Sequence, residues 1–581
     1  MTTFEVWAPA HDTVGLLIGG DRREMIRGEG GWWRLDVPAA GPGTDYAYLL
    51  PGHDTPLPDP RSRWQPAGVH GPSRVYDHGE FAWSDQAWTG RQLAGSVLYE
   101  LHVGTFTPEG TFDAAIERLD HLADLGVDLV ELLPVASFNG EYNWGYDGVC
   151  WYAPHEAYGG PDGLKRFVDA AHRRGIGVLL DVVYNHFGPS GAYAPMFAPY
   201  LNEAHQSPWG AAVNLDGPDS GEVRDYIIGS MLAWLRDYHV DGLRLDAVHA
   251  FVDETAIHLL EQMAVEVASL SAHLGRPLSL IAESDLNDPT LITPREAGGF
   301  GLSAQWADDV HHVLHAMLTG ERQGYYADFG SPESLATVLT GAFFHAGTWS
   351  SFRRRVHGRP VDRRTTPGHR FVTYLQDHDQ IGNRAAGDRI SAGLSPGLLK
   401  CGATLLFTAP FTPMLFMGEE WAAASPWQFF TSHPEPELAD AVRTGRRREF
   451  ATHGWAETDV PDPQDPATFE RSKLDWSEPG KPGHAEILDL HRRLIALRRE
   501  QPDLTDPRLD RVSVSHGDRW VMVRRGRCLV VVNLAAEPRT VDLPGPAGEV
   551  LLATEPGVVP DGDRVVLPPE SAVVVMSASP A

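Results

Sequence analysis

The sequence predicts an α/β protein, a (β/α)8 TIM barrel with a β-sandwich domain at each end. Between about residues 96 and 501, eight apolar and β-branched stretches alternate with segments of helical period. Short alternating stretches separated by Gly, Pro and Asp precede and follow this region. In a chain of 581 residues these changes of pattern predict three domains, at residues 1–90, 91–502 and 503–581.

The first domain is predicted as an immunoglobulin-like β-sandwich of short strands. Apolar and polar residues alternate in each strand candidate, and turn residues separate them. The candidates are Phe4–Trp7, Val14–Ile18, Trp32–Val37 and Tyr46–Leu50. Trp32 and Trp33 are interpreted as packing residues because the surrounding pattern is that of a core strand. A proline-rich passage over residues 56–72 then leads to the barrel.

The barrel prediction depends on eight strand candidates with amphipathic segments between them. The strand candidates are Ser96–Val103, Val127–Pro134, Ile176–Tyr184, Val240–Val248, Leu278–Ser284, Gly301–Trp306, Phe371–Leu375 and Pro413–Met417. Helices are predicted over Phe112–Leu125, Gly163–Arg174, Gly221–Tyr238, Glu254–His273 and Glu486–Arg499.

The last domain is predicted as a second small β-sandwich, because the helical period stops after Gln501. Its strand candidates are Arg511–Val514, Trp520–Val523, Cys528–Asn533, Thr540–Leu543, Val550–Leu552 and Ala572–Met576.

Charge and composition exclude several classes of partner. The formal net charge is −30 and no Lys/Arg-rich block offsets it, so we expect neither nucleic acid nor a membrane as a partner. Three cysteines without a CxxC pair indicate neither a disulfide framework nor a thiolate metal site. The first ten residues lack a basic segment followed by an apolar one. The apolar run Ala403–Gly418 contains Pro410 and Pro413 and is interpreted as a buried helix end that leads into a core strand. We expect a cytoplasmic protein.

Polar clusters follow four of the predicted barrel strands, where barrel enzymes build their sites. Asp181 to His186 ends the third strand and Gly242 to Asp246 ends the fourth. Ile281 to Glu283 ends the fifth and Asp377 to Asp379 ends the seventh. Any one cluster could be a helix cap or a solvated loop end. Four clusters at one barrel mouth favour a catalytic site instead.

Two of these carboxyl groups suit cleavage of a glycosidic bond. Asp246 and Glu283 lie on neighbouring predicted strands, as a nucleophile and a general acid of a retaining glycosidase must. Arg244 lies two residues before Asp246 on the same strand face and would keep that carboxylate ionised. Glu283 follows an apolar run, where partial desolvation raises the pKa of a carboxyl group.

In this order and on these strands, the four clusters resemble those of the α-amylase superfamily of retaining α-glucan enzymes. By that resemblance Asp246 is the nucleophile, Glu283 the general acid/base and Asp379 the third acid, which holds sugar hydroxyls. The resemblance also places Arg244, His186 and His378 in the same subsite and makes Asp181 the residue that orients the arginine. Tyr146 would be an aromatic platform for the sugar, although without the resemblance a rim packing role is favoured.

Further motifs narrow the resemblance to a few activities. Phe4 to Ala10 is similar to the sandwich that precedes the barrel in branching, debranching and trehalose-releasing members. Three pairs of stretches are similar to the trehalose-releasing hydrolases: 143–147 with 158–164, 305–312 with 320–329, and 418–421 with 428–433. The resemblance implies hydrolysis of the α-1,4 bond next to the terminal trehalose of a malto-oligosaccharide, which a separate maltooligosyltrehalose-forming synthase supplies. The alternatives are a branching enzyme and a non-catalytic glycan-binding protein, although the intact acids count against the latter.

Several residues were assigned on weaker grounds. We expect substrate contacts at His249 and Asp253, with Ala250 leaving room and residues 284–288 near the leaving group, although His249 could equally begin a helix. Asp308, Asp309, His311 and His312 lack a third ligand cluster, so no metal and no cofactor is predicted, although some superfamily members carry calcium. Asp377 departs from the family, which usually has Asn there, and adds a like charge near Asp379.

Overall fold

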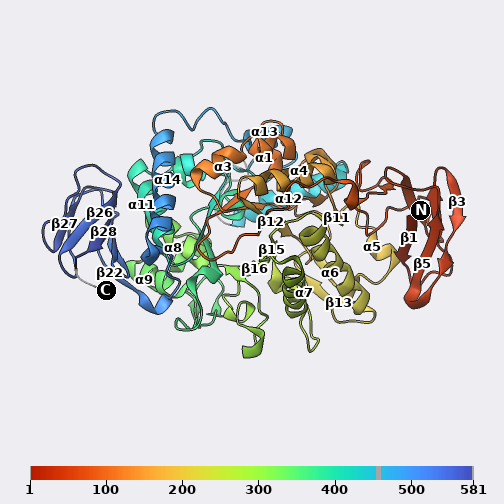
Figure 1. The fold of residues 1–581 in the computed structure, drawn as a ribbon, viewed down its shortest axis with the longest axis horizontal. Helices are drawn as coiled ribbons and strands as arrows, with labels where there is room; N and C mark the ends of the chain where they lie inside the picture. Colours follow the sequence, from red (N-terminus) through yellow and green to blue (C-terminus); the bar gives the residue numbers. More distant parts are fainter. Residues whose placement is uncertain (1, 453–459, 579–581) are drawn as a thin grey trace.

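A computed structural model describes residues 2–452 and 460–578 of the chain. The molecule is elongated, with a central helix-covered barrel and one small β domain at each end (Figure 1). The N-terminal strands lie at one end of the long axis and the C-terminal strands at the other. This arrangement confirms the predicted fold class. The domain boundaries at residues 90 and 502 stay predictions.

The barrel is closed, and its eight strands are the eight that the sequence predicted. Neighbouring strands are parallel; Leu179 pairs with Gly242, for example, and Asp181 with Arg244. In chain order the strands are β8 (Leu98–Leu101), β9 (Leu129–Leu132), β12 (Gly177–Val182), β15 (Gly242–Leu245), β16 (Ser279–Ala282), β17 (Ala304–Trp306), β20 (Phe371–Tyr374) and β21 (Thr412–Phe416).

Positions that face the inside of the barrel change from apolar to polar along the strands. Leu98, Leu129 and Leu179 form one buried cluster with Ile281 and other apolar residues. The next inward positions, two residues further along, are Glu100, Glu131, Asp181 and Glu283. An apolar floor thus supports a layer of carboxyl groups at the carboxyl ends of the strands.

The helices mostly match the predicted amphipathic segments. The larger ones of the described chain include α4 (Gly160–Arg173), α6 (Ser220–Asp237), α7 (Leu259–Leu274), α8 (Asp308–Thr319), α9 (Pro332–Gly341), α11 (Pro396–Thr408), α12 (Pro436–Thr452) and α14 (His484–Glu500). The apolar run from Ala403 is, as predicted, the end of α11 followed by β21. No helix in 2–452 or 460–578 is long and apolar enough to cross a membrane.

Two predicted helices differ from the structure. The segment predicted as one helix from Phe112 is two, α2 (Phe112–Ile116) and α3 (Leu119–Leu125), because Arg118 leaves the helical hydrogen-bond pattern and begins the second. The prediction that α7 starts at Glu254 was wrong. The preceding residues form a loop, and the His258 ring accepts a hydrogen bond from the Leu260 amide as the N-cap.

Both terminal domains consist of two sheets. At the N-terminus, β1 (Thr2–Trp7), β5 (Trp32–Val37) and β4 (Ile26–Arg27) form one sheet, and β3 (Asp21–Glu24), β2 (Gly15–Ile18), β6 (Asp45–Leu49) and β7 (Ser73–Arg74) form the other. At the C-terminus, β22 (Val512–Gly517), β23 (Trp520–Arg525), β24 (Cys528–Asn533), β28 (Ser571–Ser577) and β26 (Ala547–Ala553) face a pair, β25 (Arg539–Asp542) and β27 (Arg564–Leu567). The sequence analysis missed β27. Trp33 is buried and its indole donates to the Ala8 carbonyl, which confirms its packing role.

Two hairpins after barrel strands were not predicted, because their sequences are polar and short. One, β13 (Leu201–Ser207) with β14 (Gly210–Val213), follows β12. The other, β18 (Thr348–Ser350) with β19 (Arg355–His357), follows β17. The β13–β14 hairpin lies in the loop directly after the carboxyl end of β12. The β18–β19 hairpin comes after α8 and α9, and its turn residues Phe352 and Arg353 line a cavity with Asp379 at the mouth.

Two buried arginines connect the barrel to the C-terminal domain. Arg498 of α14 donates to the carbonyls of Phe407, Ala409, Leu504 and Phe411. Arg525 of β23 donates to the carbonyls of Thr408 at 2.8 Å, Asp506 at 2.6 Å and Leu504 at 3.3 Å. Burial lowers the pKa of both guanidinium groups. The backbone carbonyls between the two domains therefore depend on these donors.

Replacing Arg525 with Met should destabilise the junction by about 1–3 kcal/mol, because the carbonyls of Thr408 and Asp506 lose their donor, whereas Leu504 keeps Arg498. The measurement is the thermal midpoint, together with hydrogen exchange of residues 502–511. Arg527→Met is the matched control, since Arg527 is exposed and its side chain has no hydrogen bond or ion pair within the described residues. An unchanged midpoint and unchanged exchange in Arg525→Met would contradict this role.

Candidate active site

The centre of the site is the guanidinium of Arg244, which points from β15 into the barrel mouth and is almost completely buried. Its Nη1 donates to Asp181 Oδ2 at 2.8 Å and to Asp246 Oδ1 at 2.7 Å. Its Nη2 lies 3.7 Å from Glu283 Oε2. Trp306 covers the cation, with the guanidinium carbon 4.5 Å from the ring centroid. One arginine thus holds three of the carboxyl groups that the sequence analysis singled out.

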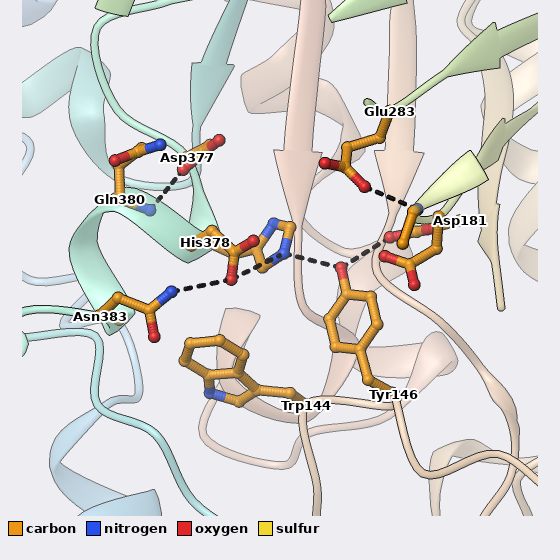
Figure 2. A network of polar contacts seen from close by, with 12 residues as sticks. Trp144, Tyr146, Asp181, Glu283, Asp377, His378, Gln380 and Asn383 are labelled. Atoms are coloured by element: carbon orange, nitrogen blue, oxygen red, sulfur yellow. Dashed lines mark hydrogen bonds and ion pairs between the residues drawn. The ribbon is translucent and has the colours of Figure 1, made fainter. Parts of the chain in front are cut away.

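A turn directly after β15 fixes Asp246 against Glu283. Ala247 adopts a left-handed conformation with φ 41°, which is strained for a residue other than glycine. In this conformation its amide donates to Glu283 Oε2 at 2.6 Å (Figure 2). The Asp246 carboxylate also accepts from the Asn185 amide group at 2.7 Å. Both acids are therefore held in place by the protein before any sugar binds.

The environment separates the acid strengths of the carboxyl groups. Burial, reinforced by the charge of Asp246 and opposed by Arg244, raises the pKa of Glu283 to about 8. Burial also raises the pKa of Asp181 to about 6, again against Arg244. A carboxyl group that keeps its proton at neutral pH can serve as a general acid.

His378 and Tyr146 link this cluster to a second one across the mouth (Figure 2). The Tyr146 hydroxyl donates to Asp181 Oδ2 at 2.7 Å and lies 2.8 Å from His378 Nε2, with the two rings stacked. Glu100 of β8 accepts from the His378 amide at 3.0 Å and contacts ring Nδ1 with its other oxygen. Although burial opposes the charge, Glu100 and Asp379 raise the pKa of His378 to about 10.

Asp379 and Asp377 have different surroundings. Asp379 has its side chain 49% exposed at the mouth, with Oδ1 3.7 Å from His378 Nε2 and 3.3 Å from the Asn383 amide nitrogen. Asp377 is buried and caps α10 (His378–Gly382) by accepting from the Gln380 amide at 2.6 Å (Figure 2). Burial and the charge of Glu100 raise the pKa of Asp377 well above its usual range. Only Asp379 is open to a ligand.

His186 lies at the mouth, as expected from the sequence. Its Nε2 is 3.0 Å from the Tyr146 carbonyl, and its Nδ1 contacts the Asn185 side chain. Burial lowers the pKa of His186. Trp209, at the tip of the β13–β14 hairpin, stacks on the His186 ring at 4.5 Å and stays 48% exposed. An exposed indole beside the acids is a surface on which a sugar can pack.

The structure does not bring His249 and Asp253 together with the acids through any described contact. His249 is exposed on a short 3-10 helix, Val248–Ala250, and its ring has no hydrogen bond to a residue of the described chain. The side chain of Asp253 is fully buried; it accepts from Arg224 at 2.9 Å and from the amides of Thr255 and Leu259. Asp253 therefore stabilises the loop before α7. Its buried side chain is not accessible for the expected contact with substrate in this structure.

A cavity of about 270 Å³ adjoins Asp379 and contains residues that the sequence analysis did not assign. Its walls include Asp308, which the sequence offered only as a metal candidate, and three residues with no predicted role: Tyr325 and, from the turn of the β18–β19 hairpin, Phe352 and Arg353. Phe352 is 47% exposed, and Arg353 Nη1 forms an ion pair with Asp285 Oδ2 at 2.8 Å. Phe352 and Arg353 reach the cavity only because the hairpin folds over it, and no periodicity in the sequence indicates this position. Glu100, in contrast, could have been found as a charged residue inside an apolar strand.

No group of three or more described His, Cys, Asp or Glu residues is arranged to hold a metal ion. Asp309, one of the residues considered for this role, accepts with Oδ2 from Asn287 and from the amides of Phe344 and His345. That oxygen supports the loop at residues 344–345.

Comparisons with known proteins agree with this geometry. Residues 76–199 match the α-amylase catalytic domain, and residues 507–574 match a domain of unknown function, DUF3459. A malto-oligosyltrehalose trehalohydrolase of Rhizobium sp. strain M-11 is 55% identical over 98% of this chain and 97% of its own. One from Mycobacterium tuberculosis is 54% identical over the full length of both chains. A branching enzyme of Corynebacterium jeikeium is 30% identical but covers only 52% of this chain.

Among solved structures, one titled a putative α-amylase from Salmonella typhimurium superimposes with a TM-score of 0.91 at 38% identity, over 99% of this chain and 97% of that one. A pullulanase from Anoxybacillus sp. superimposes with a TM-score of 0.73 at 17% identity, which shows a shared fold. The full-length identity to the curated relatives decides the family. The chain belongs to the malto-oligosyltrehalose trehalohydrolase family of the α-amylase superfamily.

Proposed function

We propose that this protein hydrolyses the α-1,4-glucosidic bond next to the terminal trehalose of maltooligosyltrehalose and releases trehalose and a shortened malto-oligosaccharide. The observation that carries the proposal is one buried guanidinium, Arg244, that holds both Asp246 and Glu283, in a chain of the trehalohydrolase family. A retaining glycosidase requires two neighbouring carboxyl groups, one as nucleophile and one as general acid, and burial raises the pKa of Glu283 to about 8.

In the first step, Asp246 is the nucleophile and Glu283 the acid. The Asp246 carboxylate attacks the anomeric carbon, while protonated Glu283 gives its proton to the glycosidic oxygen and trehalose leaves. The ion pair with Arg244 at 2.7 Å holds the Asp246 carboxylate in position. The amide of Ala247 holds the Glu283 side chain in a fixed position next to Asp246.

In the second step, the same glutamate acts as a base. The ester formed on Asp246 carries no charge, so one cause of the raised pKa of Glu283 disappears. Glu283, now ionised, removes a proton from water, which attacks the anomeric carbon and releases the sugar in the α configuration. Asp379, half-exposed beside charged His378, would hold sugar hydroxyls as the ring flattens.

The trehalose unit of the substrate fits the cavity beside Asp379 in this proposal. Trehalose joins two anomeric carbons and therefore bends away from the path of an α-1,4 chain. Arg353, Asp308 and the rings of Tyr325 and Phe352 offer hydrogen-bonding groups and apolar faces in a volume of about 270 Å³. The substrate itself would come from a maltooligosyltrehalose-forming synthase, and we place both enzymes in the cytoplasm.

Product analysis tests the activity directly. With maltooligosyltrehalose as substrate, a trehalohydrolase releases free trehalose, whereas a branching enzyme creates α-1,6 links. Free trehalose with no new α-1,6 link is the expected result. The formation of α-1,6 links would overturn the proposed function.

The nucleophile can be trapped. Glu283→Gln should lose on the order of 10³-fold in kcat on maltooligosyltrehalose, yet it should still react with a malto-oligosyl fluoride, whose leaving group needs no acid. Peptide mass spectrometry should then find the sugar on the peptide that contains Asp246. Asp246→Ala, in a Glu283→Gln background, is the control and should form no adduct. An adduct on another carboxylate would reject the assignment.

The raised pKa of Glu283 predicts where kcat/KM begins to fall on the alkaline side of the pH profile. Because the acid must be protonated, kcat/KM should fall about tenfold per pH unit above about pH 8. The same shift lowers stability as pH rises from about 4.5, the ordinary pKa of this group, to about 8, because the unfolded chain gives up the proton in this range while the folded chain keeps it. Glu283→Gln should therefore raise the thermal midpoint more at pH 9 than at pH 5. An inflection near pH 4–5, or an equal effect of the variant at both pH values, would contradict the shift.

Specificity for trehalose should depend on Arg353. Arg353→Met removes donors from the cavity and should lower kcat/KM for maltotriosyltrehalose by about 10- to 100-fold, with a smaller loss for maltopentaose. Arg355→Met, an exposed residue of the same hairpin that does not line the cavity, should leave both values unchanged. Equal losses in kcat/KM on the two pentasaccharides would mean that the cavity does not distinguish the trehalose unit from maltose.

A further inference from the structure

A second cavity lies away from the acids, between the N-terminal sandwich and the barrel. It has a volume of about 450 Å³, within the range of small-molecule sites. Strands β1, β5 and β6 form one side; β11 (Cys150–Pro154) and α6 form the other. In Figure 1 these sandwich strands lie at the N-terminal end of the molecule, beyond α6. A ligand here would contact two domains.

Most polar groups in the cavity wall already have partners in the protein. The hydroxyls of Tyr46, Tyr48 and Tyr76 donate to Asp59, the Glu5 carbonyl and Asp162, at 2.6 to 2.8 Å. Asp59 is buried and also accepts from the Arg61 amide at 2.8 Å. The other acids of the wall are paired too: Glu5 with Arg34 at 2.7 Å, and Asp237 with Arg236 at 2.7 Å. The wall therefore offers few free acceptors.

Arg61 is different, because its donors exceed its acceptors. Its guanidinium carbon lies 5.2 Å from the ring centroid of Trp32, 5.3 Å from that of Tyr226 and 5.9 Å from that of Tyr152. The side chain has a single hydrogen bond within the described chain, from Nη1 to the Tyr152 hydroxyl at 3.1 Å. Its Nε is buried without a partner. A cation held between aromatic rings with unmet donors is costly unless an acceptor arrives.

Arg63 supplies a second guanidinium on the same cavity. It is exposed and forms no ion pair or hydrogen bond with any residue that the structure describes. The remaining arginines of the wall are matched, since Arg74 forms a bidentate pair with Asp45 and Arg236 pairs with Asp237. Asp59 attracts both Arg61 and Arg63, and Asp237 attracts Arg63, but no described carboxylate forms an ion pair with either arginine. Both guanidinium groups therefore keep donors for a further acceptor.

We propose that this cavity binds a small phosphorylated sugar, with the phosphate between Arg61 and Arg63. Guanidinium groups match the oxygens of a phosphate in a bidentate manner, and a phosphate supplies the acceptors that the wall lacks. The half-buried rings of Trp32 and Tyr76 line the same space and offer apolar faces to a sugar ring. A neutral glucan fits less well, because its hydroxyl oxygens are weaker acceptors for guanidinium donors than phosphate oxygens are.

The ligand should also strengthen the contact between the two domains. Arg61 and Arg63 come from the segment between the sandwich and the barrel, whereas Gly229 and Tyr152 belong to the barrel side. A molecule that binds only the assembled cavity stabilises the folded chain by mass action. Binding should therefore raise the thermal midpoint without any change at the catalytic acids.

Isothermal titration calorimetry of the full chain with glucose 1-phosphate tests the proposal, with glucose, inorganic phosphate and maltotriose as separate titrants. Glucose 1-phosphate should bind at least tenfold more tightly than each of the other three. Arg63→Gln should weaken its binding by about tenfold or more, the loss of one charge-assisted contact, without loss of fold. Arg22→Gln is the matched control, because Arg22 is an exposed arginine of the same domain outside the cavity.

Arg61→Gln provides a second test, since it removes the half-buried guanidinium that contacts the rings. If it folds, it should abolish the binding of glucose 1-phosphate; if it does not, Arg63→Gln decides the matter. Binding that both variants leave unchanged would overturn the site. Equal affinity for inorganic phosphate would overturn the assignment to a sugar, and tighter binding of maltotriose would replace it with a neutral glucan. No heat of binding with any titrant would overturn the proposal altogether.

Discussion

The structure of the site depends on one buried cation. Arg244 is enclosed by the barrel wall, and a guanidinium removed from water is tolerated only when carboxylates and a polarisable ring surround it. Asp181 and Asp246 meet that need with ion pairs at 2.8 and 2.7 Å, and Glu283 lies 3.7 Å from the same guanidinium on the next strand. The residue that would otherwise destabilise the barrel thus fixes the positions of the two groups that act on the sugar. Removing it would leave buried like charges facing one another, so structure and catalysis share a single requirement.

From Arg244 the polar contacts continue across the mouth without interruption. Asp181 accepts from Tyr146, whose hydroxyl contacts His378, and Glu100 contacts the far side of that ring. Each group fixes the orientation of the next, so the side chains on the two sides of the mouth are held in one relative arrangement. Because Glu100 keeps His378 positively charged, a cation faces Asp379 where that acid meets substrate.

The sequence predicted what local patterns determine. All eight barrel strands and the four polar clusters were found because apolar runs end in polar residues at each strand end, a signal contained within a few positions. Contacts made by folding could not be found in this way. Phe352 and Arg353 reach the cavity only through the folding of a hairpin whose sequence has no periodicity. Asp253 is buried against Arg224, which lies 29 positions earlier in the chain, and no local pattern indicates that contact. The sequence therefore placed Asp253 at the substrate. The likeness to a known family supplied residue roles, but not these contacts.

Asp377 shows how the network accommodates a change of residue. At this position the family usually has Asn, and an additional anion beside Asp379 and Glu100 would be repelled by both. Burial and these charges raise the pKa of Asp377 well above its usual range, which favours the protonated, uncharged form of the side chain. A neutral carboxyl group still accepts a hydrogen bond from the Gln380 amide at 2.6 Å and so caps α10. The side-chain oxygen of an asparagine would make the same capping hydrogen bond. The position therefore selects for an acceptor at the start of the helix, and protonation makes the acid equivalent to the amide without adding charge to the site.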